Sequence, residues 1–235
     1  MPVALVTGAN RGLGLEFTRQ YLDAGWHVLA ACRNPEESDA FEAIASDRLE
    51  PIAIDVTDHD TIARAAEALG DRPIDVLINN AGVFGPNSGQ HNDWRQTFGH
   101  MDYDIWADVI RINTMGPFRM AEAFIDNVAR SDQKKLITIS SNMGSIGDPE
   151  KGQHFAYRTS KAAVNMAMAT LAEALAPQEI VVALLDPGWC RTDMGGGGAD
   201  YDPAESVGRM RGIIDGLTIG DTGRFLRHDG YEHPW

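Results

Sequence analysis

The sequence predicts an α/β protein with a single doubly wound parallel sheet of about seven strands and helices on both faces. Short apolar runs alternate with longer helical patterns, and the runs lack the polar alternation of a half-solvated sheet. The 235 residues can bury one core without repeats or a low-complexity linker, so residues 1–235 are expected to form one domain. The expected strands are Val3–Val6, His27–Ala31, Pro51–Asp55, Val76–Asn79, Leu136–Ser140, Ile180–Leu185 and Arg224–Leu226. The most prominent expected helices are Leu13–Ala24, Ile105–Val128 and Tyr157–Ala176.

The first expected strand runs into a glycine-rich turn and then into a helix. Gly8, Gly12 and Gly14 let the backbone turn tightly and approach a ligand. The N-terminus of the following helix offers N–H groups and a partial positive charge to a pyrophosphate. Because the turn lies between a strand and a helix, it indicates a nucleotide site. A tight turn that needs glycine for structural reasons alone is the alternative.

Tyr157 and Lys161 lie four positions apart in an expected helix, and therefore on the same face. An ammonium beside a phenol favours the phenolate, so we expect the pKa of Tyr157 to fall below its usual value of about 10. A tyrosine of this kind can serve as a general acid or base near neutral pH. A surface pair without chemistry is the alternative for these two residues taken by themselves.

Further motifs follow one another along the chain. They are Thr7 with Gly8, Gly12 and Gly14; Asp55 in IDV; NNAG (79–82); Asn113 in INTMGPF; Ser141 in TISS; Tyr157 with Lys161; and PGWCRTDM (187–194). In this order they resemble the short-chain dehydrogenase/reductase family over nearly the whole chain. The resemblance is strongest to its carbonyl-reductase-like branch, which includes the C-factor and sniffer proteins. It implies a Rossmann fold and an oxidoreductase.

The resemblance also implies a set of site residues. The catalytic residues would be Asn113, Ser141, Tyr157 and Lys161. The cofactor-binding residues would be Gly8, Asn10, Arg11, Gly12, Leu13, Gly14, Arg33, Asp55, Val56, Asn80, Ala81, Gly82, Tyr157, Lys161, Pro187, Gly188 and Thr192. For the substrate we expect Ser141 and Tyr157 to be joined by Met143, His154 and Trp189, which are chosen by residue type rather than by the resemblance.

These residue types suit carbonyl reduction. Tyr157 would protonate the carbonyl oxygen, and the Ser141 hydroxyl would donate a second hydrogen bond to it. Lys161 would also reach the nicotinamide ribose, and Asn113, at a local disturbance of its helix, would hold a water that links Lys161 to solvent. Taken singly, Asn113 can be a helix irregularity or a cap, and Ser141 an ordinary hydroxyl at a strand end.

The residues after the second strand favour NADP(H), with NAD(H) also possible. NAD-preferring sites usually carry an acid there for the ribose 2′-hydroxyl. This chain has Cys32 and Arg33, and Arg11 lies in the glycine turn, so two guanidinium groups could pair with a 2′-phosphate. Solvated surface arginines are the alternative. Asp55 would accept from the adenine amino group, unless it only forms a turn.

The substrate side of the site is less well defined. Sixteen positions separate Ser141 from Tyr157, slightly more than is usual in the family, and Gly147–Phe155 is expected to bulge at the pocket mouth. The run Gly195–Gly198 lies where the family carries its substrate lid. Side chains that could line the pocket, or pack in the core instead, are Phe84, Trp94, Met143, His154, Trp189 and Met194.

The composition restricts partners and location. The net charge is −14 without a basic run, which argues against nucleic acid and anionic membranes as partners. Cys32 and Cys190 are too few for a disulfide framework, and the seven histidines show no metal-ligand spacing, so no metal is expected. Residues 1–6 are too short for a signal sequence and no stretch approaches a membrane span, so we expect a cytoplasmic protein.

The sequence therefore predicts an NADP(H)-dependent reductase of aldehydes or ketones on a small, largely apolar substrate. The main alternative is a cofactor-binding regulatory or signalling protein of the same fold, which would not need to keep the serine and the tyrosine. A dehydratase or epimerase is another possibility. A homodimer or homotetramer is expected, because alanines cover more than one face of Tyr157–Ala176 and the family pairs its two long helices. Alanine as a simple helix former is the alternative.

Overall fold

The sheet has seven parallel strands in the order β3-β2-β1-β4-β5-β6-β7. The computed structural model describes residues 1–85, 94–148 and 152–235. The strands are β1 (Val3–Thr7), β2 (His27–Cys32), β3 (Leu49–Ala53), β4 (Val76–Asn79), β5 (Lys135–Ile139), β6 (Val181–Asp186) and β7 (Phe225–Arg227). The predicted fold class is confirmed. Strand order reverses between β1 and β4, whose carboxyl ends therefore border a crevice suited to a ligand.

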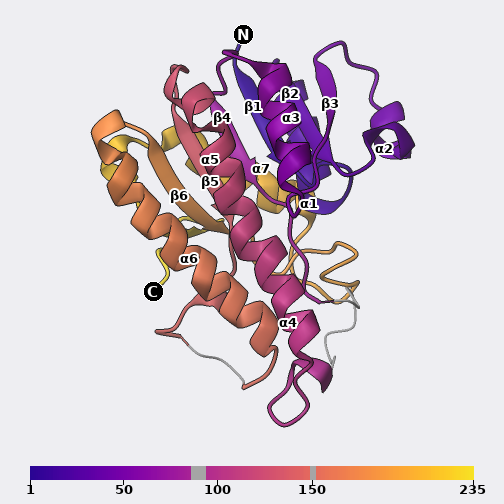
Figure 1. Cartoon of the computed structure of the whole chain (residues 1–235), viewed down its shortest axis with the longest axis vertical. Helices are drawn as coiled ribbons and strands as arrows, with labels where there is room; N and C mark the ends of the chain where they lie inside the picture. The colour runs from indigo at the N-terminus through magenta and orange to yellow at the C-terminus, as the bar shows by residue number, and fades with distance from the viewer. Residues whose placement is uncertain (86–93, 149–151) are drawn as a thin grey trace.

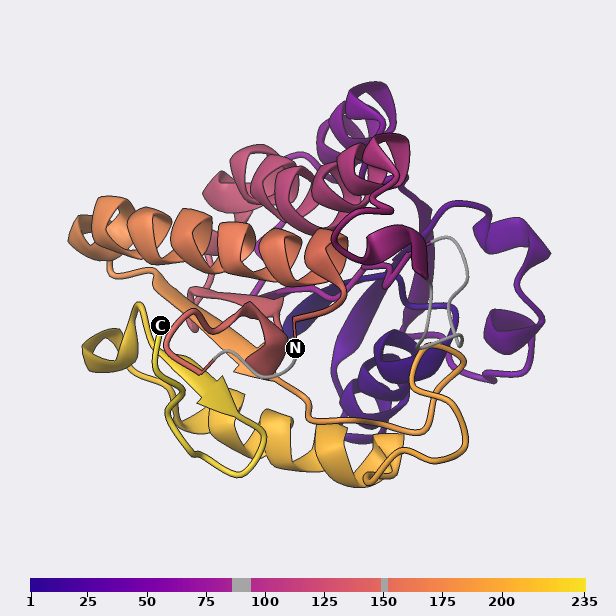
Figure 2. The ribbon, with the colours of Figure 1, turned by 90° about the horizontal axis from the view of Figure 1, so that it is seen from below.

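Helices cover both faces of the sheet (Figures 1 and 2). They are α1 (Gly12–Asp23), α2 (Asp39–Glu42), α3 (His59–Leu69), α4 (Tyr103–Ile110), α5 (Gly116–Ala129), α6 (Phe155–Leu175) and α7 (Pro203–Gly216). Short 3-10 turns are Pro35–Glu37, Trp94–Gln96, Asn142–Gly144, Ala176–Gln178 and Ile219–Asp221. Helices α3, α5 and α6 lie on one face, and α1 and α7 on the other. Within the three described ranges, no helix has the length and apolar composition of a membrane span.

Alternate residues of each strand supply two separate cores. On β1, for example, Val3 and Leu5 pack toward α3, α5 and α6, whereas Ala4 and Val6 pack toward α1 and α7. The first core contains Met120 and Phe124 of α5. This division follows from the two-residue period of a strand and explains why the strand sequences are apolar without alternation.

Two elements differ most from the sequence expectation, while the ends of most other elements shift by one or two residues. Strand β3 begins two residues earlier than predicted, at Leu49, and ends at Ala53. Among the described residues, β3 pairs with β2 alone at the edge of the sheet, so Pro51 is tolerated there, while Asp55 lies beyond the strand in a turn. The predicted long helix Ile105–Val128 is interrupted by a π-helical segment, Arg111–Met115, between α4 and α5.

Candidate active site

The glycine turn between β1 and α1 is closed tightly. Gly8 and Gly12 have φ values of +64° and +54°, a region that favours glycine. At Gly14 a Cβ atom would lie 2.2 Å from the carbonyl oxygen of Gly8, so only glycine fits without a shift of the backbone. The Arg11 side chain does not cap the helix. The first turn of α1 therefore keeps N–H groups available to a ligand, as the sequence pattern predicted.

The turn is held against the NNAG segment at the end of β4. The Thr7 hydroxyl accepts hydrogen bonds from the backbone N–H groups of Asn80 and Ala81, each at 3.0 Å. The Asn80 amide in turn donates to the carbonyl of Thr7 at 2.8 Å and to that of Gly8 at 3.3 Å. These bonds hold the glycine turn and the end of β4 together at the point where the strand order reverses.

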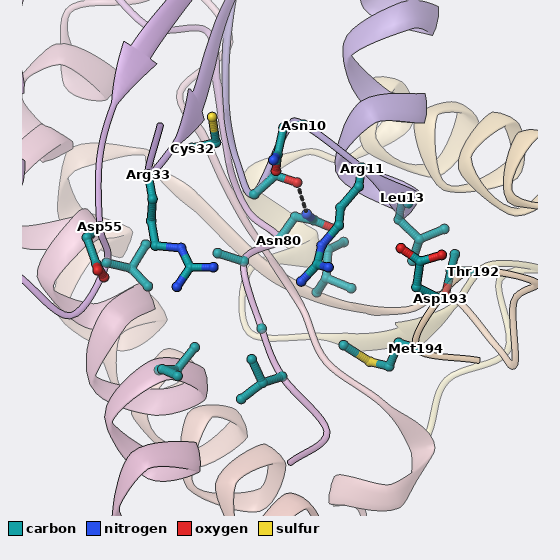
Figure 3. A pocket seen from close by; sticks show the side chains of 18 of the residues that line it. Asn10, Arg11, Leu13, Cys32, Arg33, Asp55, Asn80, Thr192, Asp193 and Met194 are labelled. Atoms are coloured by element: carbon teal, nitrogen blue, oxygen red, sulfur yellow. Dashed lines mark hydrogen bonds between the residues drawn. The ribbon is translucent and has the colours of Figure 1, made fainter. Parts of the chain in front are cut away.

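A cavity of about 960 Å³ opens at this edge of the sheet (Figure 3). Most of the predicted cofactor residues line it: Gly8, Asn10, Arg11, Gly12, Leu13, Arg33, Asp55, Val56, Asn80, Ala81, Gly82, Tyr157, Lys161, Pro187 and Thr192. Gly14 and Gly188 do not form its wall, and neither do Asn113 and Ser141. The cavity thus brings together the glycine turn, the NNAG segment and the Tyr–Lys pair.

At one end of the cavity two guanidinium groups extend toward each other (Figure 3). Arg11 comes from the glycine turn and Arg33 from the residue after β2. Both side chains are exposed, and neither donates a hydrogen bond to the part of the chain that the structure describes. Asp55 also lines this region, and its carboxylate accepts from the N–H and the hydroxyl of Thr57 at 2.8 and 2.7 Å. Asp55 is therefore a turn-former as well as a wall residue.

Tyr157 and Lys161 lie on the first turns of α6, and both are buried. The Lys161 ammonium donates to the carbonyl of Ile139 at 2.8 Å and lies 5.7 Å from the centre of the Tyr157 ring. Burial lowers the pKa of Lys161 to about 8, although the charge of Asp186 acts against this. Burial also raises the pKa of Tyr157, and a hydrogen bond with Ser141 only partly offsets the effect.

The expected direction of the tyrosine pKa was therefore wrong for the protein alone. We expected Lys161 to lower the pKa of Tyr157, but removing the phenol from water raises it. Lys161 lies over the ring, 5.7 Å from its centre, and is not among the groups that lower the pKa of the phenol, so its charge does not compensate for burial. The phenol is consequently held in its protonated form, the state in which a general acid must start.

Asn113 lies in the π-helical segment Arg111–Met115, at the disturbance that the sequence predicted. Pro117 lacks an N–H group, so the carbonyl of Asn113 cannot receive the usual helical bond from four residues later. The Asn113 side chain exchanges two 2.8 Å bonds with the backbone of Val83 and donates to the Ser160 hydroxyl at 3.0 Å. It is therefore rigidly held beside Gly82, where a Cβ atom would lie 3.2 Å from its oxygen and 3.8 Å from the Lys161 nitrogen.

Ser141 follows β5 and begins a 3-10 turn. Its hydroxyl accepts from the N–H of Met143 at 3.2 Å, which fixes the direction of the side chain. The segment is pressed against α6, because a Cβ atom at Gly144 would lie 2.8 Å from the Lys161 backbone. The Ser141 hydroxyl also donates to the side-chain oxygen of Asn142 at 3.3 Å, and its interaction with Tyr157 acts to lower the pKa of the phenol.

Some of the residues that were expected to line the substrate pocket lie in the cavity wall, and others do not. Phe84 packs against the rings of Tyr157 and His154, with centroid separations of 4.6 and 5.0 Å. Met194 lines the cavity wall, whereas Met143, His154 and Trp189 do not.

The predicted lid lies next to Trp189. The indole N–H of Trp189 donates to the carbonyl of Gly195 at 2.9 Å and so holds the first residue of Gly195–Gly198. The exposed side chain of Trp94, on the 3-10 turn Trp94–Gln96, packs against His100. Residues 149–151 of the lengthened segment Gly147–Phe155 lie outside the described residues.

Sequence reasoning missed two residues near Tyr157 and Lys161. Gln96 is fully buried, and its amide accepts from the N–H of Tyr157 at 3.3 Å and donates to the carbonyl of Phe84 at 2.9 Å. Asp186, the last residue of β6, is 2% exposed and acts electrostatically on both Tyr157 and Lys161. A charged residue at the end of an apolar strand is the signal that could have indicated Asp186. Among the described residues, no group of three or more His, Cys, Asp or Glu side chains could hold a metal ion.

The fold and the site together define an α/β protein of the dinucleotide-binding class that carries a buried tyrosine and a buried lysine, Tyr157 and Lys161, at its crevice. The family described as short chain dehydrogenase matches residues 2–200. The chain belongs to this family of oxidoreductases, which confirms the resemblance found in the sequence.

Individual relatives point to the same branch of the family. The chain is 40% identical to the C-signal protein of Myxococcus xanthus over 163 residues, which cover 69% of this chain and 93% of that protein. The structure is similar to the NADPH-bound carbonyl reductase from chicken fatty liver, with a TM-score of 0.89, 32% identity and full coverage of both chains. It is also similar to the carbonyl reductase Sniffer of D. melanogaster, with a TM-score of 0.85, 30% identity and full coverage of both chains.

Proposed function

We propose that this protein is an NADP(H)-dependent oxidoreductase that reduces aldehyde or ketone groups of small, largely apolar compounds to alcohols. The observation that supports it most directly is the placement of Tyr157 and Lys161 in the wall of a cavity that also contains the glycine turn. A candidate general acid and a candidate nucleotide site therefore line the same cavity.

The residues present fit a nicotinamide dinucleotide. The cavity of about 960 Å³ is at the upper end of the range of about 300–1,000 Å³ for ligand pockets. Gly8, Gly12 and Gly82 leave bare backbone on its wall, and the uncapped first turn of α1 faces it. These groups would hold the pyrophosphate and the nicotinamide half, and Asp55 and Val56 the adenine. When bound, the cofactor supplies the hydride that reduces the carbonyl carbon.

The chain's own residues would manage the proton. As negative charge develops on the carbonyl oxygen, the protonated Tyr157 donates its phenolic proton and the Ser141 hydroxyl donates a hydrogen bond. The Lys161 ammonium, buried beneath the ring, stabilises the phenolate that remains. Asn113 holds the backbone of Val83, and the neighbouring Gly82 lies next to the Lys161 ammonium, so we expect the proton to return to Lys161 from this side.

Arg11 and Arg33 favour NADP(H) over NAD(H). Both guanidinium groups lie at the cavity wall without a hydrogen bond to the described protein, and both suit a 2′-phosphate. The chicken carbonyl reductase, whose structure contains NADPH, and a Pseudomonas aeruginosa carbonyl reductase solved in complex with NADP support the same preference.

A screen of aldehydes and ketones, followed by NADPH absorbance, tests the function. Tyr157→Phe should lower turnover by about 10²–10⁴-fold or more, because it removes only the transferable proton. NADPH affinity should stay within a few-fold. Tyr103→Phe, at an exposed tyrosine on α4, is the matched control and should leave turnover unchanged. The mechanism is wrong if Tyr157→Phe keeps most of the activity, and the function is wrong if the parent protein reduces no carbonyl compound.

The similarity to C-signal supports a second candidate, a cofactor-binding signalling protein of the same fold. A sensor of this kind would bind NADPH without needing the Ser141 and Tyr157 hydroxyls. The burial of Tyr157 beside Lys161, with Ser141 next to the phenol, favours the enzyme. NADPH binding by a parent protein that lacks turnover across the screen would favour the sensor.

A further inference from the structure

Asp186 is a buried carboxylate that the proposed chemistry does not use. It ends β6 immediately before the Pro187–Gly188 turn. One carboxylate oxygen accepts from the N–H of Gly188 at 3.0 Å, and the other lies 2.9 Å from the Nε2 nitrogen of His233. The His233 side chain is 6% exposed and that of Asp186 is 3% exposed. A carboxylate removed from water to this extent is strongly destabilising unless its oxygens are paired, so this contact is structurally important.

His233 is itself held firmly against β7. Its N–H donates to the carbonyl of Phe225 at 2.9 Å, and its ring packs on those of Phe225 and Tyr231 at centroid separations of 4.7 and 5.3 Å. Its ring nitrogen therefore reaches Asp186 from a fixed position. The pair connects the C-terminal segment of the chain, residues 232–235, to the end of β6.

The same segment lies beside the loop that follows Ser141 (Figure 2). The Ser145 hydroxyl donates to the carbonyl of Pro234 at 2.7 Å, and the N–H of Gly147 donates to that of Trp235 at 2.6 Å. At Gly147 a Cβ atom would lie 2.9 Å from the Trp235 carbonyl oxygen, so the two backbones are in close contact.

The loop Ser141–Gly147 is therefore held by hydrogen bonds on both sides. Its inner side contacts α6, where the Asn165 amide donates to the carbonyl of Gly144 at 3.3 Å. Its outer side contacts residues 234 and 235 through the two bonds described above. The position of Ser141 at the start of this loop therefore depends on the segment that His233 anchors.

We propose that Asp186 and His233 are positioning residues for carbonyl reduction: their buried pair fastens residues 232–235 to the end of β6 and so fixes the Ser141–Gly147 loop against α6. The proposal rests on the proposed function for its kinetic part. Neither side chain is assigned contact with the substrate or the cofactor.

Asp186 has an electrostatic role in addition. The titratable and charged groups that it influences are Tyr157 and Lys161 on α6, Cys190 after the Pro-Gly turn, Arg227 of β7, and His228, with His233 as its direct partner. Its negative charge supports the ammonium form of Lys161. Asp186→Asn should therefore move the high-pH limit of the reduction rate to lower pH, a change that loss of packing alone would not produce.

Hydrogen exchange and kinetics of His233→Ala test the positioning role. Amide hydrogen exchange in residues 142–148 should become faster, because the carbonyls of Pro234 and Trp235, which accept from Ser145 and Gly147, are no longer held in place. The turnover number for carbonyl reduction should fall by about 10- to 100-fold, as expected for a small misplacement of a reacting group. NADPH affinity should change little, because the cavity wall is intact. His233→Gln, which offers an N–H donor near the Nε2 position, should restore much of the loss.

His27→Ala is the matched control, since His27 pairs with Glu50 at 2.8 Å at the opposite, amino end of the sheet. It should leave residues 142–148 and the turnover number unchanged. The proposal is overturned if His233→Ala has the same hydrogen exchange at residues 142–148 and the same turnover number as the parent. It is also overturned if His27→Ala changes the exchange and the turnover number as much as His233→Ala does. A parent protein that reduces no carbonyl would overturn the proposed function, whereas unchanged exchange at residues 142–148 would overturn the fastening itself.

Discussion

Burial controls the ionisation of the Tyr157–Lys161 pair more than the proximity of the two groups does. The pKa of the phenol is raised and that of the ammonium is lowered to about 8, and in both cases removal from water is the largest cause. Protein burial disfavours the charged form of either group. The pair is therefore poised with a neutral acid and a cation that titrates close to physiological pH.

We expect the rate of carbonyl reduction to fall as pH rises through about 8. Above this value Lys161 loses its proton, and the phenolate that forms on Tyr157 lacks a supporting charge. Below it both groups are protonated and competent. The measurement is kcat/KM for a carbonyl substrate between pH 6 and pH 10, in roughly half-unit steps around the pKa range. A rate that stays constant up to about pH 10 would show that Lys161 does not act as a cation in the reaction.

Arg11→Ala combined with Arg33→Ala should weaken NADPH far more than NADH. Each charge-assisted bond to a phosphate contributes about 1.5–3 kcal/mol, so the pair should lower NADPH affinity by on the order of 10²–10⁴-fold. The NADH ribose has no phosphate and should be affected little. Fluorescence titration with both cofactors measures this, with Arg64→Ala on the exposed side of α3 as control. Equal losses for NADPH and NADH would contradict the assignment of the two arginines.

At the scale of elements, the glycine turn between β1 and α1 has no space for a Cβ atom at Gly14. Gly14→Ala would place a methyl group 2.2 Å from the Gly8 oxygen and 2.5 Å from the Asn80 amide nitrogen. The turn must open, so we expect a loss of about 1–3 kcal/mol in the free energy of unfolding and a marked loss of NADPH affinity. Thermal unfolding and cofactor titration measure the two effects.

The control for this substitution is Gly212→Ala on α7. Gly212 is exposed and lies inside a helix, and a Cβ atom added there would meet no atom within 4 Å. Alanine there should stabilise by about 0.4–1 kcal/mol without changing cofactor affinity. Equal responses at the two glycines would show that the tight turn is not the cause.

Elements with a strong local signal could be predicted, and those decided by neighbours could not. Strand β4 has the predicted bounds, because an apolar run ends directly at the polar NNAG segment. The bounds of β3 depend on pairing with β2 alone, and Pro51 was not an obstacle on an edge. A break near Asn113 was expected, but its π-helical form depends on Pro117 and on the packing of Val83 against Asn113.

At the scale of the whole molecule, exposed apolar side chains favour self-association. Met166 on α6 is 68% exposed, and Phe118 on α5 and Met115 in the π-helical segment are 37% and 46% exposed. These helices cover the same face of the sheet (Figure 1). Pairing of α5 and α6 with their copies in a second subunit would bury these side chains in an isologous interface. We therefore expect a homodimer, or a tetramer of dimers.

Sedimentation at micromolar concentration should show a mass of at least two subunits. Met166→Glu should shift the protein toward monomer, because it places a charge in an apolar interface. Ile219→Glu, at an exposed isoleucine in the 3-10 turn before β7, is the control and should not change the mass. A single species of monomer mass for the parent would instead favour alanine as a simple helix former in α6.

The parts of the site that depend on distant segments are those that sequence reasoning missed. The glycine turn, Asn113, Ser141, Tyr157 and Lys161 each have a local motif. The contact between Asp186 and His233 joins residues 47 positions apart, and neither belongs to a pattern that indicates a partner. In the sequence, an acidic residue at a strand end and a histidine before a proline do not indicate a contact, because only the path of the chain through β7 brings them together.

The central position of β1 has a consequence for how the chain is made. β1 pairs with β2 on one side and with β4 on the other, and about 44 residues separate the end of β2 from the start of β4. At a synthesis rate of roughly 5–20 residues per second, a nascent chain that has formed the β1–β2 pair waits roughly 2–9 s for β4. During that interval one side of an apolar strand has unpaired N–H and C=O groups, which can pair with another chain. The pace of translation between residues 32 and 76 therefore sets how long each new molecule is exposed to misassociation.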